Sequence, residues 1–142
     1  MVIADKPQGK IRICIDPRNL NQAIKRHHYP LNTLEDVAAR IPGARIFSTF
    51  DAYQGFFQIK LSESSSKLTT FQTPFGRYRY KRLAMGISSS PEIFQKAMMD
   101  MFEGLEGVEC VMDDILVWGC NDFEHNSRLE KVLQRVRERG LN

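Results

Sequence analysis

The sequence predicts an α+β fold in which helices pack on one face of a mainly antiparallel sheet. The expected elements follow the order strand, helix, strand, strand, paired strands, helix, paired strands and helix, so both kinds of element are mixed along one chain. Of the 142 residues, 42% are hydrophobic and 26% are charged, as is typical of soluble globular domains. This length suits one domain or part of one and is sufficient to bury a hydrophobic core.

The first part of the chain predicts two strands and one helix. The segment Lys10–Ile15 (KIRICI) alternates polar and apolar residues, which indicates a half-buried strand, and a polar connector is expected at 16–21. Residues 32–35 (NTLE) form a capping box that starts a short helix, and Pro42-Gly43 ends it. The segment Ile46–Asp51 (IFSTFD) indicates a strand that ends on an acidic residue.

The middle of the chain predicts strands joined by polar turns. Residues 56–61 (FFQIKL) have the composition of a strand, and residues 62–66 are expected to form a serine-rich loop. Residues 68–72 and 77–83 indicate a strand pair joined through the turn residues 73–76 (TPFG).

The last part of the chain predicts two amphipathic helices separated by a hairpin. Residues 89–92 (SSPE) have the form of a capping box with proline in the first turn, and the helix that follows is expected to end at Gly104. Strands at 108–112 and 115–118 form the hairpin, and a further capping box at 121–124 starts a helix that reaches Gly140. The expected inward residues are Ile93, Phe94, Ala97, Met98, Met101 and Phe102 in the first helix and Phe123, Leu129, Val132, Leu133 and Val136 in the second.

Charge is distributed unevenly, although the net charge is only +3. Residues 1–90 hold 14 lysines and arginines against 6 acidic residues, a balance of +8, whereas residues 91–142 hold 6 against 11, a balance of −5. The first part is therefore suited to a polyanion and the second to a cation, with solvated surface charge as the simpler alternative.

Composition argues against a membrane protein and a zinc centre. No apolar run approaches the roughly 18 residues of a membrane span, and the N-terminus MVIADKPQGK lacks the apolar region of a signal peptide. The cysteines, Cys14, Cys110 and Cys120, have no metal-ligand spacing and are expected to be buried or free thiols of a reducing compartment.

Two adjacent carboxylates, Asp113 and Asp114, interrupt the apolar hairpin in CVMDDILVWG. Like charges this close repel unless a cation lies between them, and oxygen-only ligands favour a hard divalent metal such as Mg²⁺. A third carboxylate, Asp51, closes the strand 46–51 and would join them if the two strands were neighbours in one sheet. The residues alone leave two alternatives open, an exposed turn for the pair and a turn or helix-cap role for Asp51.

Several linked motifs, in order along nearly the whole chain, resemble the fingers-palm region of reverse transcriptases of the gypsy-class LTR-retrotransposon and retroviral Pol type. The matching segments are KIRICIDPRNLN (10–21), FSTFDAYQGFFQI (47–59), LTTFQTPFGRYRYKRLAMGISSSPEIFQ (68–95), VMDDILVWG (111–119) and the helix expected at 122–140. The resemblance implies a polymerase palm, with a ferredoxin-like antiparallel sheet and helices on one face, plus part of the fingers. It places the fingers at approximately 1–26 and 60–89 and the palm at approximately 27–59 and 90–142.

The resemblance also implies an activity, RNA-directed DNA polymerase, which adds dNTPs to a primer 3′-OH on an RNA or DNA template. The catalytic and metal-binding residues would be Asp51, Asp113 and Asp114, which would hold two Mg²⁺ ions, with Mn²⁺ as a substitute. Such two-metal sites stabilise the attacking and leaving oxygens of a phosphoryl transfer.

Further residues match nucleotide-contacting positions of the family. Phe56 falls at the aromatic steric gate that rejects a ribose 2′-OH by shape, and Arg12 falls at a triphosphate-contacting arginine, a role that suits guanidinium geometry. The remaining matches in this group are Lys6, the backbone amides of Ala52, Tyr53 and Gln54, and Met85, which lies where relatives often carry phenylalanine or glutamine.

A third group matches template and primer contacts. Gly86, Ser89 and Pro91 belong to the motif that shapes the nucleotide and template floor, where a glycine permits close backbone approach. Val111 stands where the family most often has tyrosine or phenylalanine, so the packing under the primer terminus would be looser. The other matches are Met112, Arg77 and Arg79, with Lys67, Lys81 and Arg82 as further phosphate contacts.

The resemblance places the end of the chain before the thumb and any RNase H segment of the parent polyprotein, so those segments are expected partners, together with template, primer and dNTPs. We expect the isolated fragment to have weak or no activity, in an intracellular location that the family implies. Two alternatives remain open: a nucleic-acid-binding remnant without catalysis, and a metal-dependent nuclease or a nuclease label inherited from the RNase H segment.

Overall fold

The chain divides into two compact units in the computed structural model, and each is described by itself. One unit comprises Met1–His27 and Gln54–Pro91, and the other comprises His28–Tyr53 and Glu92–Asn142. The residues that the structure describes are 2–5, 11–25, 29, 34–41, 43–111 and 114–141.

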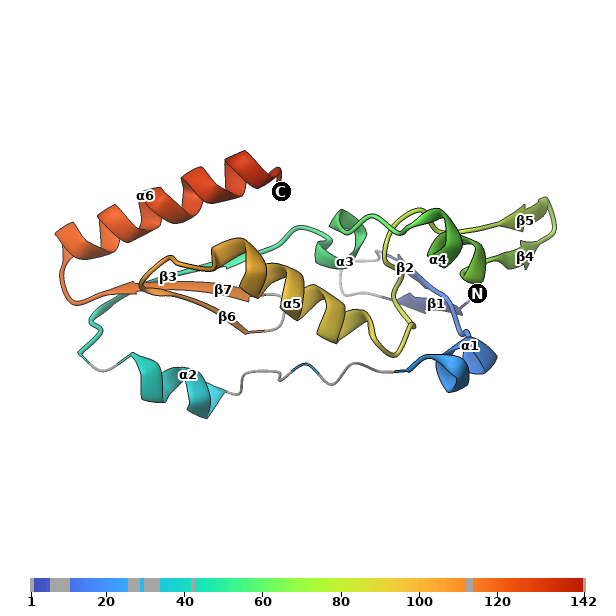
Figure 1. Ribbon diagram of the computed structural model, residues 1–142, viewed down its shortest axis with the longest axis horizontal. Coiled ribbons are helices and arrows are strands. Elements are labelled where there is room, and N and C mark those ends of the chain that lie inside the picture. The colour runs from blue at the N-terminus through green and yellow to red at the C-terminus, as the bar shows by residue number, and fades with distance from the viewer. Residues whose placement is uncertain are drawn as a thin grey trace. The chain divides into compact units, whose positions relative to one another are not determined.

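Among its described residues, the first unit contains two small antiparallel sheets and three short helices, whose elements are labelled in Figure 1. Strand β1 pairs with β2, and β4 pairs with β5. A small core of Ile15, Ala84 and Ile87 is packed against Phe71 and Tyr80 among others. The elements of this unit are β1 (Val2–Asp5), β2 (Ile11–Cys14), α1 (Arg18–Ala23), α3 (Gly55–Gln58), α4 (Glu63–Leu68), β4 (Phe71–Thr73) and β5 (Gly76–Tyr78).

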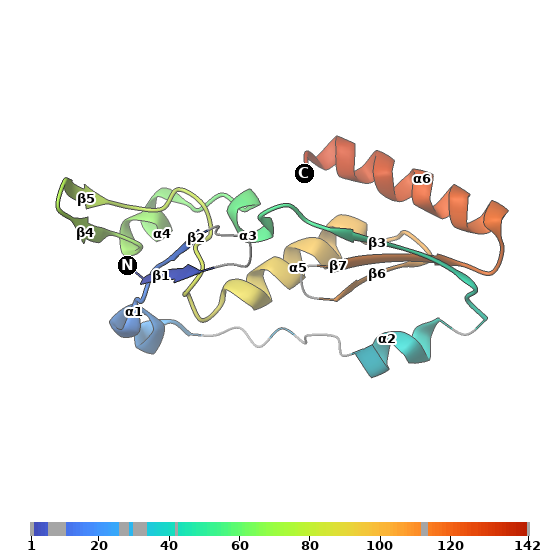
Figure 2. The same ribbon diagram turned by 180° about the vertical axis from the view of Figure 1, so that it is seen from behind.

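The second unit is built on a three-stranded antiparallel sheet with the order β3-β7-β6. Figure 2 shows this sheet from behind, with β7 between its two partners. The elements of this unit are α2 (Leu34–Arg40), β3 (Ile46–Asp51), α5 (Ser90–Phe102, which begins just before the division), β6 (Val108–Val111), β7 (Asp114–Gly119) and α6 (Asp122–Arg139).

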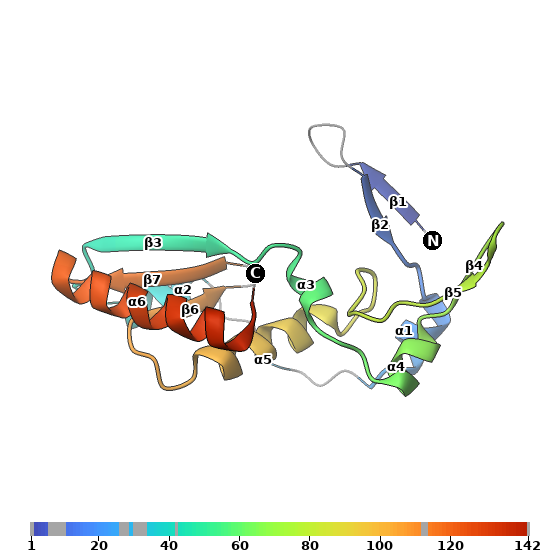
Figure 3. The ribbon, with the colours of Figure 1, turned by 90° about the horizontal axis from the view of Figure 1, so that it is seen from above.

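Helices α5 and α6 lie on the same face of this sheet (Figure 3). Strand β7 alternates between buried and less buried residues, and its buried residues Ile115 and Val117 are 3% and 0% exposed. From α5, the side chains of Phe94 and Met98 are each 2% exposed. One face of the sheet is therefore the core of this unit, and the other face carries the pair Asp51 and Asp114 as well as the apolar pair Phe47 and Trp118.

Helix α6 is capped at its N-terminal end, next to the end of β7. The Asn121 side chain accepts a hydrogen bond from Glu124 N–H at 2.9 Å, and the Glu124 carboxylate accepts one from Cys120 N–H at 2.7 Å. These contacts satisfy donors that a helix start leaves unpaired. The hydrogen bond from Cys120 N–H is the main cause that lowers the pKa of Glu124, so the cap contributes stability above the ordinary Glu pKa and loses it as pH falls through the lowered value.

His125 connects α6 to the central strands. Its Nε2 atom lies 3.0 Å from Ser48 Oγ on β3, and its side chain is 6% exposed. A Cβ atom added at Gly119 would lie 2.6 Å from His125 N and 2.7 Å from its Cα. The backbones of β7 and α6 are thus in direct contact at a position that only glycine fits.

The expected α+β class is confirmed, with an antiparallel sheet that carries α5 and α6 on one face (Figure 3). Strands β2 and β3, the pair β4–β5, the hairpin β6–β7, and the helices α2, α5 and α6 were all expected, although β4 and β5 are shorter than the sequence suggested. Among the described residues, no helix is both long and apolar enough to cross a membrane.

Three short helices were not expected, because each lacks an apolar stripe. The polar connector contains α1, in which Asn21 N–H bonds to Pro17 O, and no residue of this helix is buried. The serine-rich loop contains α4, capped by Ser62, whose side chain accepts from Ser65 N–H. The expected strand at 56–61 is wrong. Gln54 adopts a left-handed conformation and the chain turns into α3, and only Lys60 of the later residues makes an isolated bridge, with Arg82.

Some residues expected to face inward are exposed. Phe123 is 86% exposed, Ile93 42% and Leu133 37%. The helical spacing of apolar residues predicts a broad buried stripe on each helix. Among the described residues, only a narrower stripe is buried, where each helix packs on the sheet. In α6 the buried positions are His125 and Val132.

Replacing Gly119 with alanine tests the contact between β7 and α6. We expect Gly119→Ala to lower the free energy of unfolding by about 1–3 kcal/mol, because the added methyl group collides with backbone atoms of His125. Urea titration measures the change. Lys131→Ala, an exposed change on the same helix, is the control and should remain within about 0.5 kcal/mol of wild type. Equal stability of the two variants would contradict the packing described here.

Candidate metal centre and its surroundings

Two of the predicted acids lie directly opposite each other. Strands β3 and β7 are antiparallel, and their register pairs Asp51 with Asp114. Directly opposed residues in an antiparallel pair point to the same face, with Cβ atoms about 4.5–5.5 Å apart. Both residues are exposed. The expected adjacency of the two strands is confirmed, although the acids are 63 positions apart in the sequence.

The hairpin positions Asp114 at the start of β7. Val111, the last residue of β6, pairs with Asp114, so a two-residue connection joins the strands. That connection is Met112-Asp113, which lies outside the described residues. Within the described part of the chain no group of three potential metal ligands is found. Because Asp113 is not in that part, the expected three-acid set remains a prediction.

The chemistry of the opposed pair fits a hard cation. Like charges directly opposite each other on a sheet are destabilising, and no ion pair to Asp51 or Asp114 is found among residues 43–111 and 114–141. Two carboxylates supply the oxygen ligands that Mg²⁺ takes from proteins, and their exposure leaves room for water or phosphate oxygens. A divalent ion would therefore be accommodated here.

Buried side chains support the strand that precedes the hairpin tip. Gln95 on α5 is 1% exposed and donates a hydrogen bond from Nε2 to Cys110 O at 3.0 Å. Burial, with a smaller contribution from Glu109, raises the pKa of Cys110 to about 12, so this thiol stays protonated. No pattern in the sequence indicates this role of Gln95, because a glutamine on a helix is usually exposed.

A turn at Tyr53-Gln54 follows the end of β3 at Asp51. Ala52 is 5% exposed and Tyr53 70%. Gln54 has a φ of 50°, the left-handed region that non-glycine residues seldom adopt. Phe56, in α3, is half-buried. The nucleotide-contact roles predicted for these four residues remain predictions.

The loop Met85–Ser89 is held closely against the segment that follows β2. Ile15 N–H donates to Met85 O at 3.1 Å. Gly86 has a φ of 105°, and a Cβ atom there would lie 1.9 Å from Ile15 O, so this position requires glycine. Gly86 is exposed and Ser89 half-buried, and Pro91 is an exposed residue of the first turn of α5.

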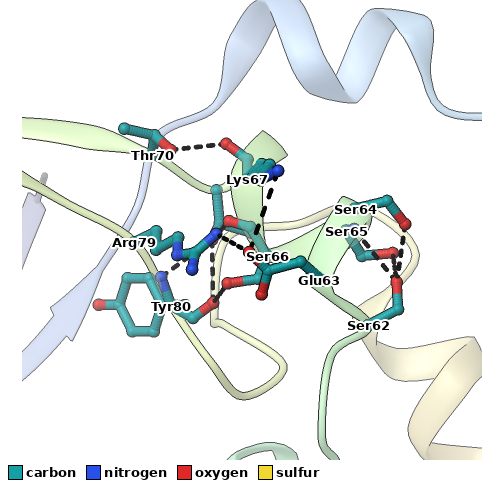
Figure 4. A network of polar contacts seen from close by, with 10 residues as sticks. Ser62, Glu63, Ser64, Ser65, Ser66, Lys67, Thr70, Arg79 and Tyr80 are labelled. Carbon is teal, nitrogen blue, oxygen red and sulfur yellow. Dashed lines mark hydrogen bonds and ion pairs between the residues drawn. The ribbon is translucent and has the colours of Figure 1, made fainter.

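The basic residues near β5 differ in their surroundings. Arg77 is exposed, whereas Arg79 pairs with Glu63 at 2.8 Å, and Lys67 reaches the same carboxylate at 4.0 Å (Figure 4). Arg82 donates to Gln58 O at 2.8 Å. Arg79 is therefore partly neutralised by a local partner, which the sequence did not indicate because Glu63 is 16 positions away.

A buried polar network fixes the base of the β4–β5 hairpin. Ser66 and Thr69 are 3% and 4% exposed. The Ser66 hydroxyl donates to Tyr80 O (Figure 4). Tyr80 N–H donates to Thr69 Oγ1 at 2.9 Å. These contacts join α4 and its C-cap to the segment after β5 that carries Arg79 and Lys81. The sequence does not indicate these buried contacts, because serine and threonine in a polar run are more often exposed.

Two predicted phosphate contacts cannot be placed. Lys6 lies outside the described residues, and Arg12 is described only as part of the β2 backbone. Their roles remain predictions.

The chain matches the family described as "Reverse transcriptase (RNA-dependent DNA polymerase)" over residues 4–142. It is 35% identical over 134 residues to the retrovirus-related Pol polyprotein from transposon 412 of Drosophila melanogaster, a match that covers 93% of this chain and 11% of that protein. It is 33% identical over 139 residues to the enzymatic polyprotein of cauliflower mosaic virus (strain Strasbourg), covering 97% of this chain and 20% of that protein. The chain thus spans a fifth or less of these relatives.

Solved structures match the fold. A prototype foamy virus protease-reverse transcriptase mutant superposes with a TM-score of 0.86 at 27% identity, covering 98% of this chain and 19% of that one. A foamy viral protease-reverse transcriptase in complex with double-stranded DNA gives a TM-score of 0.83 at 25% identity, covering 98% and 25%.

Neutralising one member of the opposed pair should have opposite effects with and without metal. In EDTA, Asp51→Asn and Asp114→Asn should each raise the thermal midpoint by roughly 2 °C, because repulsion between the carboxylates is removed. With millimolar Mg²⁺ or Mn²⁺, the wild type should gain stability and the variants should gain much less. Calorimetry measures both effects.

The matched control is Asp100→Asn, an exposed acid on α5. It should respond to metal as the wild type does. If the wild type gains no stability from either metal, or if all four proteins gain equally, the opposed pair is not a cation site.

Proposed function

The chain belongs to the reverse transcriptase (RNA-dependent DNA polymerase) family, and we propose that it carries the catalytic acids for templated DNA synthesis. The reaction would add dNTPs to a primer 3′-OH on an RNA or DNA template. The observation that supports this most strongly is the register of β3 and β7, which sets Asp51 opposite Asp114 on an exposed sheet face.

We assign metal binding to Asp51, Asp113 and Asp114. Bound Mg²⁺, or Mn²⁺ in its place, supplies Lewis-acid activation of the primer hydroxyl and charge stabilisation for the triphosphate and the leaving pyrophosphate. The contribution of the chain is a fixed arrangement of carboxylates on a paired strand, which needs little reorganisation during reaction. The core face behind the pair, with Ile115 and Val117 buried, favours such rigidity.

We further propose individual residues as nucleotide contacts. In this proposal the Phe56 ring excludes a ribose 2′-OH, and Arg12 and Lys6 bind phosphates, as guanidinium and ammonium groups do. The remaining nucleotide contacts would be the backbone amides of Ala52, Tyr53 and Gln54 and the side chain of Met85.

We propose template and primer contacts for a third group of residues. One solved relative is a complex with double-stranded DNA, which supports a nucleic-acid duplex as the ligand here. Arg77, exposed on β5, is available for a phosphate, whereas Arg79 would first have to leave Glu63. The other proposed contacts are Gly86, Ser89, Pro91, Val111 and Met112.

We further propose that the fingers comprise approximately residues 1–26 and 60–89 and the palm residues 27–59 and 90–142, bounds that follow the two units except that residues 54–59, assigned to the palm, lie in the first unit. The segment that grips the primer, the thumb and the RNase H segment would then come from a parent polyprotein, and this chain spans 11% of the transposon 412 relative. Full activity would require those segments.

Primer extension tests the proposal. The assay uses this chain and the same chain fused to the thumb segment of a related polyprotein, with a labelled primer on an RNA template. We expect incorporation that depends on Mg²⁺ or Mn²⁺ and that falls by about 10³-fold or more in Asp113→Asn, because a metal ligand is lost. Asp100→Asn serves as the control and should retain activity.

Each other outcome has a definite meaning. Equal incorporation by wild type and Asp113→Asn would show that Asp113 is not a metal ligand. Duplex binding without incorporation, even in the fusion, would favour the nucleic-acid-binding remnant. Release of nucleotides from labelled RNA·DNA without added dNTPs would favour the nuclease.

Phe56→Ala tests the steric gate in an active form of the enzyme. Removing the ring opens space beside the sugar, so the preference for dNTPs over ribonucleotides should fall by about tenfold or more. Phe57→Ala, which removes the neighbouring ring that stacks on Tyr80 at 6.2 Å, is the control and should keep the preference. An unchanged dNTP preference in Phe56→Ala would remove Phe56 from the nucleotide site.

A further inference from the structure

We propose that Asn21 is a positioning residue that fixes the backbone of Gly86–Ser88 for contact with the nucleic-acid duplex. This role rests on the proposed function, which assigns Gly86 and Ser89 to that contact. Asn21 would act through the loop, without touching the ligand. All of the contacts that carry the inference lie within the first unit.

The carboxamide of Asn21 uses both of its ends on the loop. Its Nδ2 atom donates to Gly86 O at 2.9 Å, and its Oδ1 atom accepts from Ser88 N–H at 2.9 Å. A carbonyl can only accept and an N–H can only donate, so these partners fix the orientation of the amide. The two bonds span Ile87 and set the backbone on both sides of it.

A second contact holds the other side of the same loop. Ile15 N–H donates to Met85 O at 3.1 Å, and Ile15 O lies so close to Gly86 that no side chain fits there. Ile15 and Ile87 are 6% and 8% exposed and belong to the small core of this unit. The loop is therefore held by Ile15 from one direction and by Asn21 from another, while Gly86 stays exposed.

The position of Asn21 argues against a role in core packing alone. It lies on α1, a six-residue helix in which no residue is buried. Hydrogen bonds of a half-buried carboxamide fix backbone direction but bury little apolar area. Such a contact is suited to presenting an exposed loop in one conformation, which a ligand that approaches Gly86 would require.

The test uses the full 142-residue chain and two matched variants, Asn21→Ala and Asn19→Ala. Asn19 is exposed on the same helix, so its replacement controls for changes in helix propensity. Amide exchange of Ser88 is followed by NMR, binding of a fluorescent DNA primer–template by anisotropy, and unfolding by thermal denaturation.

We expect Asn21→Ala to accelerate exchange of the Ser88 amide by at least roughly fivefold, the effect of losing one hydrogen bond. Duplex binding should weaken by a similar factor, while the thermal midpoint stays close to that of Asn19→Ala. The salt dependence of binding should not change, because no charge is lost. A purely structural role would accelerate exchange and leave the affinity unchanged, and that result overturns the proposal.

Two further results are decisive. Unchanged Ser88 exchange in Asn21→Ala would refute the loop contact itself. If Asn21→Ala fails to fold, Asn21→Asp replaces it: the variant keeps the acceptor for Ser88 and loses the donor to Gly86, so a folded variant with wild-type affinity overturns the proposal. A wild-type chain that binds no duplex refutes the proposed function as well, whereas normal wild-type binding with an unaffected Asn21→Ala refutes only the role of Asn21.

Discussion

The pairing of β3 with β7 is the constraint on which the candidate site depends. It brings Asp51 opposite Asp114, which lies 63 positions later in the sequence. The two acids are opposite each other only in this register. A slip by one residue would turn one acid to the opposite face of the sheet. Packing on the opposite face of the sheet stabilises this register. On that face Ser48 contacts the buried His125 of α6, and Gly119 leaves space for the backbone of that helix. Packing behind the sheet thereby determines which carboxylates meet in front of it.

The sequence predicted the elements whose pattern is local. The alternation in β3, the apolar hairpin around Asp114 and the capping box at Asn121 each carry their own signal, and all three were recognised. The short helices α1 and α4 were missed, because they are stabilised by side-chain hydrogen bonds to distant backbone groups and have no apolar stripe. Such contacts depend on tertiary structure, which no local pattern encodes.

In the candidate site, too, residue type predicts some features, whereas others depend on tertiary contacts. Asp51 and Asp114 could be proposed from residue type, and their meeting followed from the assumption that the two strands are neighbours. The burial of Gln95 and the pairing of Arg79 with Glu63 could not be anticipated, since both join segments far apart in sequence. Family resemblance supplied roles for residues such as Phe56, but those roles concern a ligand and must be tested with one.

The most direct test of the central claim is paramagnetic broadening of backbone amide signals by Mn²⁺ bound to the chain. If the opposed carboxylates form the metal site, substoichiometric Mn²⁺ will broaden the amides around Asp51 and Asp114 first and most strongly, and Mg²⁺ will reverse the effect by competition. Broadening centred on other acids, such as Glu103 and Glu106, or none at all, would contradict the account.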